Sequence, residues 1–362
     1  MPSCDVAIVG GGPAGSSCAW ALRRAGADVL VIDRAAFPRD KICAGWITPS
    51  VITTLQLDLD DYRSRGLTLQ PIQGFRTGVV GGPAVETSYS NVVSYAIRRC
   101  EFDHYLLERA GARVLMNTPV KTIDRRDRVW VLNGDIEASV LIGAGGHFCP
   151  VARHAGRTHR DGGLVVAQEI ELPIPPGSRC LVDEQAPELY FCADLDGYGW
   201  CVRKGSYVNV GLGRRDDREF PSQVRAFTDW LRASGRIPDA ATSTKWHGHA
   251  YILAGSVRTP RVLDGLMLIG DSAGLAYPES GEGIRPAIES GIAAARTLAK
   301  ARGTSAADFA PYAAFLAERA PSSGVAGYLP PSVTRPLGRW LLGSRTFTRR
   351  VVLDRWFLRN AA

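Results

Sequence analysis

The chain has 362 residues, enough for two domains of ordinary size, each with its own hydrophobic core. Hydrophobic residues make up 45% and charged residues 22%, as in ordinary globular proteins, which argues against a disordered chain. No apolar run approaches the roughly 18 residues that a membrane-spanning helix needs. The net charge of +7 comes mainly from residues 335–359, which hold seven arginines and one acid, and no nucleic-acid-binding motif accompanies it. No secretory leader precedes the first strand, so we expect a cytoplasmic protein.

The first part of the chain alternates between strand and helix patterns, which is typical of a parallel sheet. It opens with a β-α-β unit, expected as a strand at 6–9, a helix at 16–25 and a strand at 29–32. The next elements are expected as a helix at 101–110, a strand at 112–115, a hairpin of 120–123 and 129–132, and a strand at 139–143. This pattern predicts a first domain built on a parallel sheet.

From residue 164 the pattern changes to short alternating strands separated by Pro, Gly and Asp turns, which predicts an antiparallel sheet. Its strands are expected at 164–171, 189–194, 199–202, 207–213 and 246–252, with a helix at 221–234. The chain then returns to a buried strand at 265–269 and a long helix at 284–302. The antiparallel segment therefore interrupts the first domain and forms a second one.

A glycine-rich turn joins the first strand to the first helix. Residues 10–15 read Gly-Gly-Gly-Pro-Ala-Gly, and Asp33 closes the second strand. Gly10 permits the tight turn, Gly12 lets the backbone approach a pyrophosphate, and Gly15 lets helix and sheet pack closely. The helix N-terminus offers free N–H groups to the anion, and Asp33 can accept ribose hydroxyls. The motif predicts a dinucleotide site and does not distinguish FAD from NAD.

A second motif lies near the other end of the chain. Residues 266–274 form a buried strand that runs into Gly-Asp, and the turn at 278–283 leads into a helix. This arrangement resembles flavoproteins of the p-hydroxybenzoate hydroxylase fold. The resemblance implies that Asp271 binds the ribityl chain of FAD and that the following turn lies against the pyrimidine edge of the isoalloxazine. A helix N-terminus at 283–284 would stabilise the anion formed on flavin reduction.

Within that superfamily, four segments are similar to the geranylgeranyl reductase family. Residues 37–45 resemble its Pro-x-x-Lys-x-Cys-Gly-Gly motif, and residues 95–103 resemble its Arg-x-x-Phe-Asp segment, in which Arg99 reaches the FAD. Residues 198–204 and 208–213 resemble the Tyr-x-Trp-x-Phe-Pro-Lys and Val-Asn-Val-Gly segments of its sheet above the flavin. The likeness runs from residue 5 to about residue 300.

The chain also departs from the family pattern. Ala44 replaces the first glycine after the cysteine, Val202-Arg203 replaces Phe-Pro, and Gly145 replaces an aspartate that many relatives carry. These departures leave FAD binding intact but leave the substrate and the electron donor open.

The resemblance implies an α/β (α+β) fold, in which a Rossmann-like FAD-binding domain carries an inserted antiparallel β-sheet substrate domain. The FAD-binding domain is expected to be discontinuous, with residues 1–75, 95–160 and 255–305. The substrate domain is expected to comprise residues 76–94 and 161–254, followed by a helical, arginine-rich tail at 306–362.

The residues expected to contact FAD come from both motifs and from the family segments. They are Gly10, Gly12, Pro13, Ala14, Gly15, Asp33, Arg34, Lys41, Cys43, Ala44, Arg99, Val120, Gly270, Asp271, Gly281, Glu282, Gly283 and Ile284. The candidate catalytic residues are Cys43, Tyr198 and Trp200. No metal site is expected, since the His-x-His pair at 247–249 lacks a third ligand in view.

Each candidate catalytic residue has two interpretations. Cys43 is either a thiol close to the flavin, with Lys41 favouring the thiolate, or an inert buried cysteine. Tyr198 and Trp200 alternate with Gly199, so both rings should project from one face of the sheet. They form either the roof of an apolar cavity over the flavin or plain core.

The tail is also open to two interpretations. Residues 345–359 interleave apolar side chains with arginines. This segment either contacts an anionic membrane surface that carries a lipid substrate, or docks its apolar face on the nucleotide domain. The protein is therefore expected to be cytoplasmic and open to membrane association.

The resemblance implies an FAD-dependent oxidoreductase that reduces C=C bonds of an isoprenoid-type or other apolar substrate by hydride transfer from flavin N5. A flavin-dependent monooxygenase, such as a hydroxylase or epoxidase, is the first alternative, with a halogenase less favoured because the halogenase Trp-x-Trp-x-Ile-Pro motif is absent. A non-enzymatic flavin-binding redox sensor is the second. NAD(P)H, bound transiently, or a reduced carrier protein is expected to supply electrons.

Overall fold

The protein is described by a computed structural model that covers residues 3–159, 163–177, 180–215, 218–237, 245–258, 260–319 and 331–359. It divides into two compact units of three segments each. The first unit holds residues 1–40, 100–164 and 251–321, and the second holds 41–99, 165–250 and 322–362. Residues 41–75, expected with the FAD-binding domain, thus cluster with the antiparallel sheet. Residues 320–330 and 360–362 of the expected tail lie outside the described part.

The core of the first unit is a mainly parallel sheet of order β17-β18-β11-β1-β2-β8, with a β9-β10 hairpin attached to β11. Its strands are β1 (Ser3–Val9), β2 (Val29–Ile32), β8 (Arg113–Leu115), β9 (Ile123–Arg126), β10 (Val129–Leu132), β11 (Ile136–Gly143), β17 (Val262–Leu263) and β18 (Leu266–Leu268). All four residues of β2 are buried, as expected for a central strand between helical layers. The predicted parallel sheet is confirmed.

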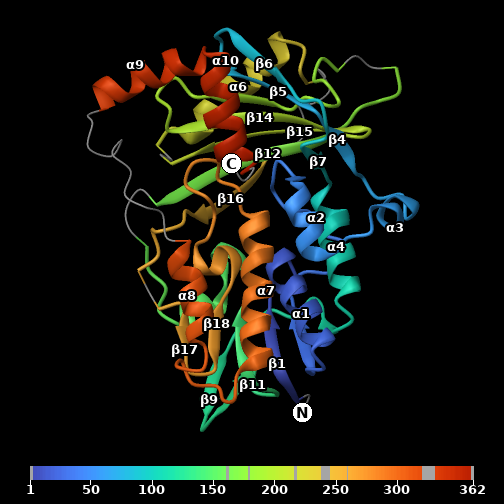
Figure 1. Cartoon of the computed structure of the whole chain (residues 1–362), viewed down its shortest axis with the longest axis vertical. Coiled ribbons are helices and arrows are strands. Elements are labelled where there is room, and N and C mark those ends of the chain that lie inside the picture. Colours follow the sequence, from blue (N-terminus) through green and yellow to red (C-terminus); the bar gives the residue numbers. More distant parts are fainter. Residues whose placement is uncertain are drawn as a thin grey trace. The chain divides into compact units, whose positions relative to one another are not determined.

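Helices pack against this sheet, and α7 lies directly beside α1 (Figure 1). The helical elements are α1 (Pro13–Arg24), α4 (Arg99–Arg109), η1 (Gly146–Phe148), α5 (Pro150–His154), η3 (Gly270–Ala273), α7 (Ile284–Lys300) and α8 (Ala310–Glu318). A side chain on Gly291 of α7 would collide with the carbonyl oxygen of Ala14 in α1. The small residue therefore lets the two helices approach at their backbones.

Several element boundaries in this unit differ from the predicted ones, among them the starts of the first helix and of the hairpin. The first helix begins at Pro13 rather than at residue 16, because proline has a backbone angle suited to a first helical turn and needs no N–H bond there. The hairpin strand begins at Ile123 rather than at residue 120. Val129 pairs with Arg126, so a two-residue turn sets the register, and the apolar residue at position 120 lies before the strand.

The second unit contains a seven-stranded sheet of order β16-β12-β15-β14-β13-β5-β6. Its strands are β5 (Gly74–Val79), β6 (Ala84–Ser88), β12 (Leu164–Pro173), β13 (Glu188–Phe191), β14 (Gly197–Lys204), β15 (Tyr207–Arg214) and β16 (His247–Ile252). The predicted antiparallel pairing is confirmed for β12, β13, β14 and β15, whereas β13 and β5 pair in parallel.

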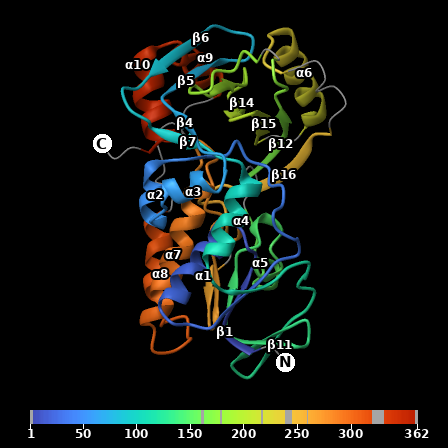
Figure 2. The ribbon, with the colours of Figure 1, turned by 90° about the vertical axis from the view of Figure 1, so that its right-hand side faces the viewer.

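Smaller elements complete this unit. They are β3 (Trp46–Ile47), β4 (Gln70–Ile72) and β7 (Ser94–Ala96), which form a three-stranded sheet, and the helical elements α2 (Pro49–Leu55), α3 (Leu59–Ser64), α6 (Phe220–Ala233), α9 (Pro331–Leu342), α10 (Arg345–Phe347) and the π-helical η5 (Thr348–Phe357). Figure 2 shows α6 and α10 on opposite sides of the large sheet. The α6 side forms a hydrophobic core in which Val224, Phe227 and Leu231 meet Val208, Val210 and other inward residues of the strands.

Candidate functional site

The glycine-rich turn follows β1 at the carboxyl edge of the parallel sheet. Gly10 has a φ of +116°, and a side chain there would collide with the backbone of Ala144, which follows β11. A side chain on Gly15 would collide with the carbonyl oxygen of Gly10. The loop thus closes tightly on the ends of two strands, and only glycine fits at these two positions.

The turn leaves the start of α1 open to an anion. Gly12 is the residue before the helix and has no side chain that could bond to the N–H groups of the first turn. Unsatisfied N–H groups and the helix dipole together favour a negative charge at such an end. Near this point stands Arg39, whose Nη2 atom is 3.3 Å from where a β-carbon on Gly12 would lie. Backbone donors and a guanidinium therefore meet beside the glycine-rich turn.

Arg39 is a residue that the sequence analysis did not include among the cofactor contacts. It pairs with the fully buried Asp103 at 3.4 Å and stacks over the ring of Phe37 at 4.6 Å. Both partners belong to the two family segments, at 37–45 and 95–103, so their similarity to the family was the available signal. The pairing itself depends on packing between distant segments and cannot be read from either one.

Asp33 lies at the end of β2 and is 8% exposed. Its Oδ2 accepts a hydrogen bond from the N–H of Gly11 at 2.7 Å, and its Oδ1 accepts one from the N–H of Ala35 at 2.9 Å. A carboxylate has about four acceptor positions, so two bonds leave capacity for hydroxyl donors. Asp33 thus shapes the glycine-rich loop, and its contact with the ribose stays a prediction.

The C-terminal motif meets the N-terminal one in the first unit. A side chain on Gly270 would lie 2.9 Å from the β-carbon of Ala14 and 3.3 Å from that of Ala287. The first turn of α1 is therefore next to the turn after β18 and the start of α7. Gly283 precedes α7 without a side chain that could cap it, and a β-carbon there would lie 3.1 Å from Oδ1 of Asp271. Two open helix N-termini and one carboxylate thus gather at the same edge of the sheet.

Arg157 ties the loops at this edge together. Its Nη1 donates to the carbonyl oxygens of Ser272 at 3.3 Å and of Asp271 at 3.5 Å, and its Nη2 donates to that of His147. Burial lowers the pKa of the Arg157 guanidinium from its ordinary value. The loop after β11 and the turn of Asp271 are therefore held as one structure, a role that no local sequence pattern indicated.

The structure places the other expected cofactor residues as follows. In the first unit, Arg34 is exposed and directly follows Asp33, and Val120 is 9% exposed in the hydrophobic core. Glu282 follows Gly281, which lies against Tyr251, and Ile284 begins α7. Arg99 begins α4 and is 8% exposed, and the remaining residues, Lys41, Cys43 and Ala44, belong to the second unit. Their contact with FAD stays a prediction.

In the second unit, Tyr198 and Trp200 project from the face of the large sheet opposite α6. Their ring centroids are 6.1 Å apart, and the indole N–H of Trp200 donates to Oδ1 of Asn209 at 2.7 Å. A side chain on Gly211, the cross-strand neighbour of Trp200, would overlap the indole ring. The indole thus lies flat over Gly211, so the shared-face prediction is confirmed, while the flavin-roof role stays a prediction.

The η5 helix packs onto this same face. Phe357 of η5 is 1% exposed, and its ring lies 5.4 Å from Tyr198 and 6.0 Å from Trp46. Asp354 accepts a hydrogen bond from the hydroxyl of Tyr89 at 2.7 Å. The docking interpretation of the tail predicted a contact with the nucleotide domain, whereas these partners all belong to the second unit. Sequence periodicity shows which face of a helix is apolar, but not which surface receives it.

The loop of Cys43 lies against the edge of this sheet. The Cys43 thiol accepts a hydrogen bond from the N–H of Gly45 at 3.3 Å, and the backbone carbonyl oxygen of Cys43 accepts one from Nζ of Lys204 at 3.3 Å. Lys41, expected to favour a thiolate, has its Nζ 2.6 Å from Nε2 of His249. The Cys43 loop thus lies next to the buried Lys204, which the sequence motif at 198–204 included without indicating this contact.

The comparisons with known proteins agree with this geometry. Residues 5–75 match the DAO family, described as FAD-dependent oxidoreductase. The chain is 32% identical to a menaquinone reductase of Mycobacterium tuberculosis, covering 82% of this chain and 76% of the relative. It is 28% identical to a digeranylgeranylglycerophospholipid reductase of Methanocaldococcus jannaschii, over 82% of this chain and 77% of that one. The chain belongs to the geranylgeranyl reductase family. It is therefore an FAD-dependent oxidoreductase.

A solved structure supports the fold assignment of this geranylgeranyl reductase family member. A geranylgeranyl bacteriochlorophyll reductase-like protein of Thermoplasma acidophilum superimposes with a TM-score of 0.73 at 21% identity, over 94% of this chain and 88% of that one. The p-hydroxybenzoate hydroxylase-like fold predicted from the motifs is confirmed. Among the described residues, no helix has both the length and the apolar character needed to cross a bilayer.

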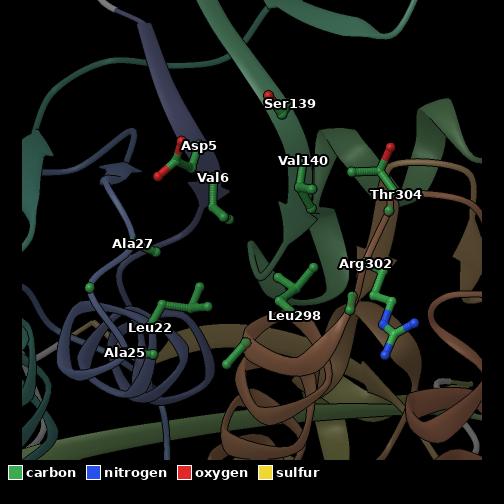
Figure 3. A pocket seen from close by; sticks show the side chains of 14 residues that line it. Asp5, Val6, Leu22, Ala25, Ala27, Ser139, Val140, Leu298, Arg302 and Thr304 are labelled. Carbon is green, nitrogen blue, oxygen red and sulfur yellow. The ribbon is translucent and has the colours of Figure 1, made fainter.

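The first unit also contains a cavity of about 420 Å³, shown in Figure 3. It lies between the first residues of β1, near Asp5, and the last turns of α1 and α7, near Leu22 and Leu298. Ligands of parallel α/β sheets bind at the carboxyl ends of the strands, which is the opposite end of β1. The cavity is therefore separate from the residues expected to hold FAD.

Proposed function

We propose that this family member reduces C=C bonds of an isoprenoid-type or other apolar substrate. The observation that carries the proposal is the face of the antiparallel sheet opposite α6, where Tyr198 and Trp200 lie together over a strand that has glycine at 211 and 213. Aromatic rings beside side-chain-free backbone provide a flat apolar surface suited to a prenyl chain. The names of the relatives, menaquinone reductase and digeranylgeranylglycerophospholipid reductase, support the same substrate class.

The residues of the first unit fit the dinucleotide that the family uses. Gly12 and the open start of α1 would receive the pyrophosphate, with Arg39 as a neighbouring cation, Asp33 would accept the ribose hydroxyls, and Asp271 would bind the ribityl chain. The bound FAD supplies hydride transfer through its N5 atom. The open start of α7 after Gly283 favours a negative charge on the group beside it.

The electron donor belongs to the same proposal. The sequence holds one Gly-x-Gly-x-x-Gly motif followed by a strand and an acidic residue, at 10–33, and we assign it to FAD. NAD(P)H would then bind transiently, or a reduced carrier protein would deliver the electrons.

An anaerobic absorbance titration tests the proposal. The FAD-loaded protein is reduced with NADH, NADPH or dithionite, and its reoxidation is followed after adding a geranylgeranyl lipid that carries no quinone ring, because a quinone would oxidise the flavin without reduction of a double bond. Reoxidation by the alkene without oxygen supports the proposal. Inertness to alkenes with rapid, product-forming reaction with air would replace it with monooxygenation, and inertness to both would favour a redox sensor.

A further inference from the structure

Two carboxyl groups share the face of Tyr198 and Trp200. Glu169 and Glu171 stand two residues apart on β12, so they project from the same side of the sheet. Their cross-strand neighbours on β15 are Gly211 and Asn209. Glu169 is therefore the cross-strand neighbour of the glycine over which the Trp200 indole lies. It belongs to the sheet face of Tyr198 and Trp200 that we propose binds the substrate.

The two carboxyl groups have different surroundings. Glu171 accepts hydrogen bonds from Lys204 at 2.8 Å and from Arg98 at 2.8 Å. Burial opposes the ionisation of Glu171, but these two cations outweigh it and hold its pKa below the usual range. The carboxylate form of Glu171 is thus favoured, and it forms an ion pair with the buried Lys204.

Glu169 has no such pair of cations. It is 6% exposed, and among the described residues its Oε2 atom has no hydrogen-bond partner. Burial raises its pKa to about 7, although Lys204, the backbone N–H of Cys43 and the side chain of Asn209 act in the opposite direction. Two carboxyl groups whose environments separate their pKa values in this way are a common arrangement for acid-base chemistry.

We propose that Glu169 is the proton donor for alkene reduction. The inference rests on the proposed function. Bound FAD in its reduced form would supply a hydride to one alkene carbon and would be oxidised by two electrons, and the other carbon would take up the proton of the Glu169 carboxyl group. The π bond is replaced by two C–H bonds. The resulting Glu169 carboxylate accepts from the Cys43 N–H and Asn209 and lies in the field of Lys204, and a proton from solvent restores the acid.

The test compares Glu169→Gln with Glu188→Gln. Glu188 is a buried carboxyl group of the same sheet, 3% exposed and bonded to Tyr190 and Arg236 in the α6-side core, so it controls for the loss of a buried carboxyl group. We expect Glu169→Gln to slow alkene-driven flavin reoxidation by about 10²-fold or more. FAD affinity and the rate of dithionite reduction should match the wild-type protein. Glu188→Gln should lower thermal stability and leave reoxidation within about twofold.

A second readout does not depend on turnover. Infrared difference spectra of the wild-type protein should show a protonated carboxyl band near neutral pH that is absent from Glu169→Gln and present in Glu188→Gln. Absence of this band from the wild-type protein, or wild-type reoxidation rates in Glu169→Gln, would overturn the donor role alone. A wild-type protein that no alkene reoxidises would overturn the proposed function itself.

A separate observation concerns the surface of α9. Val333, Leu337 and Trp340 are 49%, 47% and 73% exposed, and their spacing of four and three residues places them on one side of the helix. Leu342, the last residue of the helix, is 5% exposed, so its side chain lies in the interior. The helix is thus attached to the second unit and presents an apolar stripe to solvent.

Exposed arginines occur on the same helix and on the elements that follow it. Arg339 of α9 is exposed, as are Arg345 and Arg350 further along the described tail, and Arg335 on α9 pairs with Asp196 at 2.7 Å. Tryptophan and leucine on one side of a helix, with arginines nearby, form the pattern of an interfacial membrane helix. We propose that the apolar stripe of Val333, Leu337 and Trp340 seats on an anionic lipid surface.

Vesicle sedimentation tests this second proposal. The full chain should bind vesicles of phosphatidylcholine with phosphatidylglycerol more strongly than vesicles of phosphatidylcholine alone. Trp340→Gln or Leu337→Gln should weaken that binding about tenfold. Leu181→Gln is the matched control, because Leu181 is 45% exposed elsewhere in the second unit. Equal loss in the control, no wild-type binding, or a stripe that instead mediates self-association would overturn the proposal.

Discussion

The parallel sheet of the first unit and the antiparallel sheet of the second present their polar groups in different ways. At the carboxyl edge of the parallel sheet, the groups expected to bind FAD are mostly backbone N–H groups and glycines, with Asp33 and Asp271 beside them. On the antiparallel sheet, the polar groups are side chains that converge on one face, such as Glu169 and Lys204. A site built from backbone groups can therefore be predicted from a local sequence motif, whereas a site built from side chains on several strands depends on the register in which the strands pair.

A substitution in the glycine-rich turn should disrupt the site at the parallel sheet more than any other change considered below. In Gly10→Ala, the methyl group meets the backbone of Ala144 at a φ of +116°, so we expect a loss of about 3 kcal/mol or more and a protein purified without flavin colour. The control is Gly26→Ala, which has a φ of +87° but no neighbour within 4 Å. It should lose only about 1 kcal/mol and stay yellow. Flavin absorbance and thermal unfolding measure both, and a yellow Gly10→Ala protein would contradict the account.

A smaller effect should separate the second sheet from FAD binding. In Gly211→Ala, the methyl group overlaps the Trp200 indole and displaces it, which should cost about 1–3 kcal/mol. Alkene-driven reoxidation should fall at least about tenfold while FAD binding is retained. In Gly248→Ala, the nearest atom is Cγ of Gln168 at 4.0 Å, so both properties should be unchanged. Stopped-flow absorbance distinguishes these outcomes, and normal reoxidation in Gly211→Ala would remove Trp200 from the substrate surface.

The pH dependence of stability sharpens the contrast between Glu169 and Glu171. The pKa of Glu169 is raised to about 7, so the folded state holds its proton more tightly than the unfolded state does. Glu169 therefore stabilises the folded state at a pH below the ordinary carboxyl pKa of 4.5, and this stabilisation is lost as the pH rises to about 7. Glu171 has a lowered pKa, so it stabilises the folded state at a pH above its ordinary pKa, and this stabilisation is lost as the pH falls. Thermal unfolding of Glu169→Gln should therefore lack the wild-type decline between those pH values, and an unchanged profile would contradict the assignment.

The smallest effect is expected at the surface of the second unit. Arg335 and Asp196 are 45% and 39% exposed in their ion pair, so solvent screens the interaction. Arg335→Gln should change the free energy of unfolding by at most about 1 kcal/mol and leave FAD binding and reoxidation unaltered. Denaturant unfolding measures it, and a larger loss would show that α9 holds the unit together more than its exposed stripe indicates.

Features of the glycine-rich turn could be predicted from the sequence, whereas features that depend on strand pairing could not. The turn at 10–15 and Asp33 were readable because their steric requirements act on neighbouring residues. The start of β9 was misplaced because a turn at 127–128 sets its register. No helix or strand between residues 41 and 98 was assigned, and the parallel pairing of β5 with β13 requires contacts far apart in sequence. Glu169 was missed for the same reason, since its position beside Gly211 exists only once β12 and β15 pair.

A single-turnover mass measurement distinguishes alkene reduction from oxygen insertion by this protein. Protein with reduced FAD is mixed with a stoichiometric amount of a geranylgeranyl lipid that carries no quinone ring, once without oxygen and once in air, and the product mass is followed over time. We expect a gain of two hydrogens, from reduction of one double bond, in both cases, and we expect this product to form at least about tenfold more slowly in Gly211→Ala than in the wild-type protein. A product that forms only in air and has gained an oxygen atom would contradict alkene reduction.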